Sequence, residues 1–337
     1  MNLPDYDPIL SPLQLPVQQW RVPGHFEHPV VFPEREGATP GTLLWGAFGE
    51  ALWHTTCADR QAGQSCNQRV GAAHCLAPDR CVGPWLYKPQ SSVHRRQMTR
   101  PVLLCSTDLD RPEPVSRFSL EVTLWGRHAV AAADRIEQTL RQAGQAGLHI
   151  NGRPIRFQLE PPDQQPVATL LQRATQWHSL PLHSIELAFV TPFLYRDDKP
   201  DSQGFARPRY ERGERFPLTD MIARAAYELA AWDIEDRDIG PGLDCTQRHA
   251  LCRDTRDHAR RQVEGLQITR LALQPAHRGK RRSRHNGHDF PLTGFTGEAW
   301  IGGDLSRALP WLLMFALGGG GQKRAMGFGQ IRLRTEA

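Results

Sequence analysis

The first half of the chain alternates between apolar patterns of period two and apolar patterns of helical period. Two runs repeat apolar residues at i, i+3 and i+4 and predict helices, Leu43–Thr55 and Ala129–Ala143. Residues 23–40 hold several prolines and are expected to form a loop after the first strand. The remaining apolar runs predict strands at Val17–Val22, Phe118–Trp125 and Ile155–Leu159. A further ordered segment begins at Trp85–Lys88. The order of elements is therefore near strand, helix, strand, strand, helix, strand, which suits a ferredoxin-like unit.

The second half repeats this order of elements without repeating the sequence. Helices are predicted at Leu218–Trp232 and Leu309–Leu317, with a further helix after Thr246 in an inserted segment. Strands are predicted at Ile185–Pro192, Leu266–Leu273, Phe295–Ile301 and Ile331–Leu333. We therefore expect an α+β chain of two tandem ferredoxin-like (RRM-like) domains, residues 1–165 and 183–337, with a glycine-rich loop before the last strand.

Composition narrows the class of protein. The 337 residues are 39% hydrophobic and 23% charged, which is typical of globular proteins. No apolar run approaches the roughly 20 residues that span a bilayer. The first residues carry acids and prolines in place of a basic and then apolar signal. We expect a cytoplasmic protein.

Positive charge is concentrated in two places. The block 278–284 reads RGKRRSR and supplies Lys280, Arg281, Arg282 and Arg284. The glycine-rich loop combines a run of glycines with cations and supplies Gly319, Gly320, Gly321, Lys323 and Arg324. Exposed backbone N–H groups and arginines suit RNA phosphates, so both segments are predicted to bind RNA. A solvated loop and a packing turn are the respective alternatives. A Walker-type nucleotide site is excluded because no Gly-Lys-Ser/Thr follows the glycines.

Four cysteines cluster after the first helix, at Cys57, Cys66, Cys75 and Cys81. Four thiolates suffice for a tetrahedral zinc site, but the usual tight pairs of cysteines are missing. A structural zinc and a metal-free packed loop therefore remain alternatives. No other cofactor is expected.

Several short segments, in order along the chain, resemble the CRISPR repeat-RNA (pre-crRNA) processing endoribonucleases of the RAMP superfamily. Leu44–Gly49 is similar to the Gly-Ala-Phe-Gly segment of that family's first helix. Phe189–Phe193 resembles its strand followed by Thr-Pro. Near the C-terminus the similarity comes from Phe295–Glu298, Gly303–Leu305 and the loop Gly321–Gly329.

The resemblance implies two ferredoxin-like domains and recognition of a CRISPR repeat RNA, often as a hairpin. It also implies metal-independent cleavage, in which the ribose 2′-oxygen attacks the adjacent phosphorus and leaves a 2′,3′-cyclic phosphate. The enzyme would remain bound to the crRNA, with other CRISPR effector subunits as further partners. The alternative is a non-catalytic RNA-binding subunit of an effector complex, which shares the fold and the loop.

The family's catalytic histidine lies on or just after the first helix, so the resemblance makes His54 the first candidate for acid–base catalysis. A helix-capping role for His54 is the alternative. His25 and His28 are further candidates, and Arg21 and Arg35 are candidates for stabilising the phosphorane. The family's tyrosine partner has no clear counterpart in this region.

Overall fold

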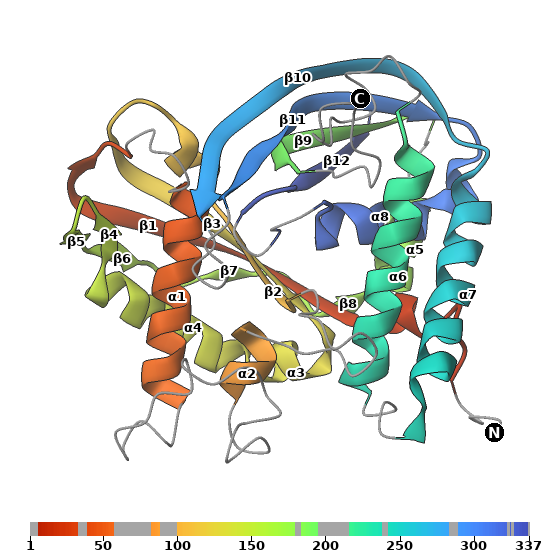
Figure 1. Ribbon diagram of the computed structural model, residues 1–337, viewed down its shortest axis with the longest axis horizontal. Helices are drawn as coiled ribbons and strands as arrows, with labels where there is room; N and C mark the ends of the chain where they lie inside the picture. The colour runs from red at the N-terminus through yellow and green to blue at the C-terminus, as the bar shows by residue number, and fades with distance from the viewer. Residues whose placement is uncertain are drawn as a thin grey trace.

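The fold is described from a computed structural model (Figure 1). It describes residues 6–32, 39–56, 82–87, 100–178, 183–194, 216–237, 242–282, 289–321, 324 and 327–335. Two antiparallel sheets, each covered by helices on one face, account for most of these residues.

The first sheet is built around β1 (Pro16–Val30) and has the strand order β2-β3-β1-β6. Its other strands are β2 (Val102–Cys105), β3 (Val115–Trp125) and β6 (Phe157–Leu159), and the short β7 (Asp163–Gln164) and β8 (Ala168–Thr169) also pair with β1. The even-numbered residues from Gln18 to Phe26 of β1 and from Phe118 to Leu124 of β3 are buried against α1 (Pro40–Thr56) and α4 (Ala133–Ala146). The odd-numbered residues lie on the other face, as the two-residue period of a strand requires.

The second sheet has the same topology. Its strand order is β10-β11-β9-β12, formed by β9 (Ile185–Phe193), β10 (Gln267–Arg282), β11 (Asp289–Gly302) and β12 (Ile331–Thr335). The helices α6 (Leu218–Asp236) and α8 (Leu305–Gly318) provide its apolar partners. In each sheet the first and third strands of the unit are central, which is the ferredoxin-like arrangement. The predicted pair of tandem ferredoxin-like folds is confirmed; the domain limits at 165 and 183 remain a prediction.

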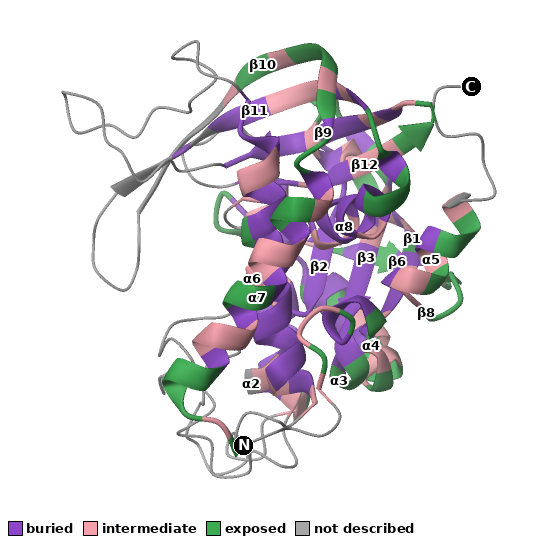
Figure 2. Cartoon of the chain, turned by 90° about the vertical axis from the view of Figure 1, so that its right-hand side faces the viewer, coloured by how far each residue is buried: buried purple, intermediate pink, exposed green. Residues whose placement is uncertain are grey.

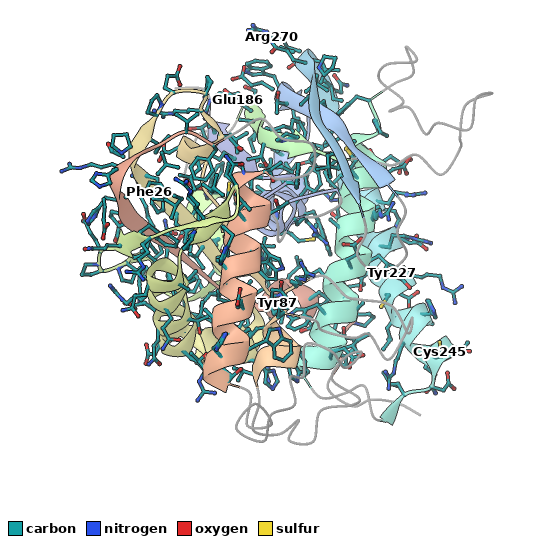
Figure 3. The ribbon with its side chains drawn as sticks, turned by 60° about the vertical axis from the view of Figure 1, so that its left-hand side comes forward. Phe26, Tyr87, Glu186, Tyr227, Cys245 and Arg270 are labelled. Carbon is teal, nitrogen blue, oxygen red and sulfur yellow. The ribbon has the colours of Figure 1, made fainter. Side chains whose placement is uncertain are left out.

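The other elements connect or extend the two units. Short elements in the first half are η1 (Pro12–Gln14), α2 (Val82–Tyr87), η5 (Asp108–Asp110), α3 (Gly126–Ala131), β4 (Leu148–Ile150), β5 (Arg153–Ile155) and α5 (Leu170–His178). In the second half, α7 (Cys245–Val263) packs on α6 as the predicted additional helix. Tyr227 of α6 meets His249 of α7, with 2.6 Å between the hydroxyl oxygen and Nδ1 (Figure 3).

Three predictions about the first half were wrong in detail. The first strand does not end at Val22 but continues to Val30, because Pro23 costs the sheet only a donor and its carbonyl still accepts from the Glu160 N–H at 2.9 Å. The expected single helix 129–143 is two helices, because Ala132 has φ −92° and ψ 12° and interrupts the helix. The strand expected at Ile155–Leu159 is divided between β5 and β6.

The two units are joined by a buried carboxylate. The Asp236 side chain at the end of α6 is fully buried. It accepts from the backbone N–H groups of Arg127 at 2.7 Å and His128 at 3.2 Å, and lies 3.0 Å from His128 Nδ1. The imidazole of His128 also stacks on Trp85, with ring centroids 4.8 Å apart. These contacts fix the start of α3 in the first half to the end of α6 in the second.

Burial follows the same two-layer organisation (Figure 2). In the first half, Phe26 packs against Phe118 and Phe157, and in the second half Phe189 packs against Phe193 and Phe295. Much of the edge strand β10 is exposed. In the part of the chain that the structure describes, no helix has the length and apolar character needed to cross a membrane.

Candidate functional site

The glycine-rich loop joins α8 to β12 and has an unusual backbone. Gly319, Gly321, Gly327 and Gly329 all have positive φ, between 63° and 81°. The loop folds on itself, since the Gly320 N–H donates to the Gly329 carbonyl at 2.9 Å. It is also tied to the second sheet, since the Gly329 N–H donates to the Pro192 carbonyl at 3.0 Å.

Glycine is required here for close packing as well as for the backbone angles. A Cβ on Gly329 would lie 1.8 Å from the Gly320 carbonyl oxygen, and a Cβ on Gly320 would lie 2.3 Å from the Phe193 ring. The loop is therefore a tightly packed turn, which was the alternative to RNA binding in the sequence analysis. Its role in binding RNA remains a prediction.

Arg324 holds this loop to α6. Its guanidinium is ion-paired with Glu228 and donates to the carbonyls of Gly318 at 3.4 Å and Gly319 at 3.3 Å. Only 10% of its side chain is exposed. The neighbouring cavity, lined in part by Arg324, Glu228 and Trp125, has a volume of about 30 Å³. A cavity of this size holds only a few water molecules, so it is too small for a nucleotide.

The loop lies where three elements of the two halves meet. A Cβ on Gly327 would lie 3.4 Å from Gly41 Cα, in the first turn of α1, and 3.5 Å from the Leu104 carbonyl oxygen in β2. We call this contact of the glycine loop, the start of α1 and the end of β2 the junction. Arg35, predicted as a catalytic candidate, lies outside the described residues.

A polar row crosses the first sheet beside the junction. Residues paired across neighbouring strands are Cys105 of β2, Glu121 of β3 and Arg21 of β1. Glu121 is ion-paired with Arg332 of β12, which brings a cation of the second half to this row. Burial raises the pKa of the Cys105 thiol, with the Glu121 carboxylate nearby as a further cause, so this thiol is held neutral.

Among the predicted catalytic residues that the structure describes, Arg21 lies nearest to the junction. It is two strand spacings from β2, or about 10 Å. Its side chain is exposed, and its Nε donates to the Ser119 hydroxyl oxygen at 3.0 Å.

His25 lies on the same face of the sheet as Arg21. It is half-buried and is paired across the strands with Arg117 of β3 and Gln158 of β6. A histidine between an arginine and an amide, on a sheet face that already carries Arg21, can accept or donate a proton beside a bound phosphate. We call the residues Arg21, His25, Arg117 and Ser119 the open-face cluster.

His54 lies away from both features. It is in the last turn of α1, thirteen residues after Gly41, which corresponds to about 20 Å along the helix. Helix α1 also covers the opposite face of the sheet from the open-face cluster. The His54 side chain is 46% exposed, and its Nε2 lies 3.9 Å from a Glu50 carboxylate oxygen one turn earlier.

The remaining predicted residues are spread over the molecule or lie outside the described residues. His28 is exposed at the far end of β1. Lys280, Arg281 and Arg282 are in β10, paired with Pro291, Phe290 and Asp289 of β11, so the basic block belongs to a long hairpin and not to a loop between strands. Their side chains are not described. Outside the described residues lie Arg35, Arg284, Lys323, Cys57, Cys66, Cys75 and Cys81.

Among the described residues, no three His, Cys, Asp or Glu side chains gather as a metal site would require. The sequence reasoning missed Arg117, Glu121 and Arg332. The alternation of polar and apolar residues in Phe118–Trp125 already placed Ser119 and Glu121 on one face. Nothing local could show that Arg332 would meet them.

Comparison with solved structures finds chains of similar fold. A Cas6 chain in a partial Cas6-RT-Cas1–Cas2 complex is 12% identical and has a TM-score of 0.51, covering 96% of this chain and 46% of that chain. The chain has the fold of Cas6. A Thermus thermophilus Cas6 is 13% identical, with a TM-score of 0.45 and coverage of 95% of this chain and 99% of that one. A Cas6 product complex is 16% identical, with a TM-score of 0.48 and coverage of 94% and 99%.

The match to a sequence family covers a smaller part of the chain. The family model AF_1859_N, described as an N-terminal domain, matches residues 15–178. These residues run from the start of β1 to the end of α5 and so include the whole first sheet. No curated protein sequence matches the chain.

Proposed function

We propose that the protein is an endoribonuclease that binds a CRISPR repeat RNA as a stem-loop and cleaves it without a metal ion. The 2′-hydroxyl attacks the adjacent phosphorus, and the products carry a 2′,3′-cyclic phosphate and a 5′-hydroxyl. The protein remains bound to the crRNA and meets other CRISPR effector subunits. The observation that carries the proposal is the junction, where a positive-φ glycine loop of one half meets the first helix of the other beside Arg21.

The glycine loop is suited to holding RNA more than to cutting it. Its described cation, Arg324, is committed to Glu228 and to the loop's own carbonyls. It therefore contributes little charge to a ligand and keeps the loop in one conformation. We expect the basic hairpin β10–β11 to extend the contact along the RNA stem through Lys280, Arg281 and Arg282, and Gly319, Gly320 and Gly321 to contact the RNA backbone. Arg284 and Lys323, outside the described residues, remain predicted RNA-binding residues.

The chemistry is assigned to the open-face cluster. Arg21 stabilises the negative charge of the phosphorane, and His25 moves the proton of the 2′-hydroxyl or of the leaving oxygen. The geometry favours His25 over His54, because His25 shares a sheet face with Arg21 whereas α1 holds His54 behind the sheet. Arg35 is a second candidate for the electrostatic role, and His28 lies too far along β1 to share a phosphate with Arg21.

A cleavage assay on repeat RNA in the presence of EDTA tests the proposal. Purified protein should cut at one position and leave a 2′,3′-cyclic phosphate, detected by its resistance to 3′-end ligation until the end is opened. A 2′-deoxy substitution at the scissile nucleotide should abolish cleavage without abolishing binding. Cleavage of the 2′-deoxy RNA would rule out the proposed chemistry.

One observation favours a non-catalytic RNA-binding subunit as the second candidate. His54, the first choice from the resemblance, is solvent-exposed and has only Glu50 as its ion-pair partner among the described residues. If the protein binds repeat RNA tightly and cuts none of it, this second function is the correct one.

A further inference from the structure

A large groove at the far end of β1 is not used by the proposed function. It has a volume of about 830 Å³ and is lined by residues 27–31 of the chain and by the hairpin β4–β5. Figure 1 shows β4 and β5 beside the end of β1. Its size lies within the range of roughly 300–1,000 Å³ that is typical of ligand sites.

The hairpin is an addition to the ferredoxin-like unit. It lies between α4 and β6, forms a separate two-stranded sheet and turns at Asn151 and Gly152, both with positive φ. The hairpin pairs with no strand of the main sheet. Its removal would leave the order β2-β3-β1-β6 unchanged, so the hairpin is available to bind a ligand.

Among the described residues, the basic side chains of the groove outnumber the acidic ones. Three basic side chains line it, His28 on the β1 side and Arg153 and Arg156 on the hairpin side, against one acid, Glu27. Arg153 and Arg156 are exposed, and neither has an ion-pair or hydrogen-bond partner among the described residues. Other arginines of the first half, such as Arg141 with Glu137 at 2.8 Å, are paired.

Apart from Asn151, the rest of the described lining is apolar, and none of it is aromatic. It includes Val30, Ile150 and Ile155, and Val31, whose side chain is 54% exposed. Arginines match phosphate oxygens, and aliphatic walls tolerate ribose and base edges. Because no aromatic ring lines the groove in the part of the chain that the structure describes, the groove offers no platform for stacking a base. It would therefore bind the RNA backbone and not recognise the base sequence.

We propose that this groove binds the sugar-phosphate backbone of a single-stranded RNA segment that continues from the cleaved region. The inference rests on the proposed function, because His25 of the open-face cluster lies only three residues before His28 on β1. An RNA strand that passes the open-face cluster is therefore within about 10 Å of the groove. Arg153 and Arg156 each contact one phosphate, and the groove has no preference among bases.

Salt-dependent binding of two RNAs tests the proposal, with a hairpin that has a twelve-nucleotide oligouridine flank and the same hairpin without a flank. For the Arg153→Gln/Arg156→Gln variant, the slope of log affinity against log salt should fall by about 1.4 with the flanked RNA, since each single-strand phosphate contact contributes about 0.7. The slope with the blunt hairpin should not change. Replacing oligouridine with oligoadenine or a mixed sequence should give the same result.

A matched control removes the same charge elsewhere. Arg127→Gln/Arg135→Gln takes two exposed arginines from α3 and α4 in the same half of the molecule. It should leave both slopes unchanged, and Arg153→Lys/Arg156→Lys should retain the wild-type slope because it retains the charge. Circular dichroism and thermal unfolding confirm that each variant is folded. If the double glutamine variant is not folded, the single variants Arg153→Gln and Arg156→Gln replace it, each with an expected fall in slope of about 0.7.

The outcomes separate this inference from the proposed function. The groove proposal is wrong if the slope falls equally for the groove and control variants. It is also wrong if the slope of the groove variant falls equally with flanked and blunt RNA. Wild-type binding that is specific to the flank, together with no cleavage of repeat RNA, overturns the enzymatic function and retains the groove. Failure of the wild-type protein to bind flanked RNA overturns both.

Discussion

The two halves of the molecule have the same strand order but differ in what surrounds their sheets. The first half has a short edge strand, β2, and an open face that carries Arg21, His25 and Arg117. The second half has a long hairpin with a basic end, an additional helix α7, and the glycine loop before its last strand. The two halves therefore share a topology, and they differ in their insertions and in the residues on their exposed sheet faces. In the proposed enzyme the first half cuts RNA and the second half holds it.

The largest expected effect separates the two histidines of the first half. We expect His25→Ala to lower the single-turnover cleavage rate of repeat RNA by about 100-fold or more, the usual contribution of a general acid or base. Arg21→Ala should lower it by a comparable factor of about 100, because the phosphorane loses a fixed cation. Gel quantification of cleaved repeat RNA under saturating enzyme measures both rates.

His54→Ala is the control for this comparison. It removes an exposed imidazole of the same half that lies on the other side of the sheet. Its cleavage rate should stay close to that of the wild type. Loss of activity in His54→Ala with full activity in His25→Ala would return the chemistry to the end of α1 and contradict the assignment made here.

The next effect concerns the glycine loop of the second half. Gly329→Ala combines a positive φ of 65° with a Cβ placed 1.8 Å from the Gly320 carbonyl oxygen. We expect a loss of about 3 kcal/mol in the free energy of unfolding, because backbone strain and steric overlap add. Urea unfolding followed by circular dichroism measures the loss. A change below about 1 kcal/mol would show that the loop rearranges easily and is not a rigid holder of RNA.

The sequence predicted features that depend on nearby residues, and it missed those that depend on residues far apart in the chain. Period-two and helical patterns, as in Phe118–Trp125 and Leu218–Trp232, predicted both ferredoxin-like units. The four-residue strand β2 was missed, since a short, wholly buried apolar run carries no period. The junction could not be predicted, because Gly327 meets Gly41 across nearly the whole chain. The ion pair of Arg332 with Glu121, 211 residues apart, has the same origin.

Two ion pairs, one within the second half and one between the halves, are expected to give smaller effects. Arg324–Glu228 lies within the second half and its side chains are 10% and 32% exposed, whereas Arg332–Glu121 joins the halves and its side chains are 40% and 45% exposed. We expect a coupling free energy of about 2 kcal/mol for the first pair, because removing one partner leaves a mostly buried charge. The second pair should give less than about 1 kcal/mol, because solvent screens it.

Double-mutant cycles with Arg324→Gln and Glu228→Gln, and with Arg332→Gln and Glu121→Gln, measure both couplings from urea unfolding. Raising the salt concentration should weaken the coupling between the halves more than the coupling within the second half. The reverse order would mean that backbone packing holds the loop and that the Arg324–Glu228 pair contributes little to its stability.

The smallest expected effect has the opposite sign and lies in α1. Gly46 is exposed within this helix, and a Cβ at Gly46 would meet nothing within 4 Å. Gly46→Ala should therefore raise the free energy of unfolding by about 0.5–1 kcal/mol, because alanine loses less backbone entropy in a helix than glycine. Compared with Gly329→Ala, it distinguishes a glycine that the fold tolerates from one that the junction requires. If Gly46→Ala proved as damaging as Gly329→Ala, this face of α1 would have to be covered in the folded protein, and the start of α1 would be part of an interface that the exposed surface does not reveal.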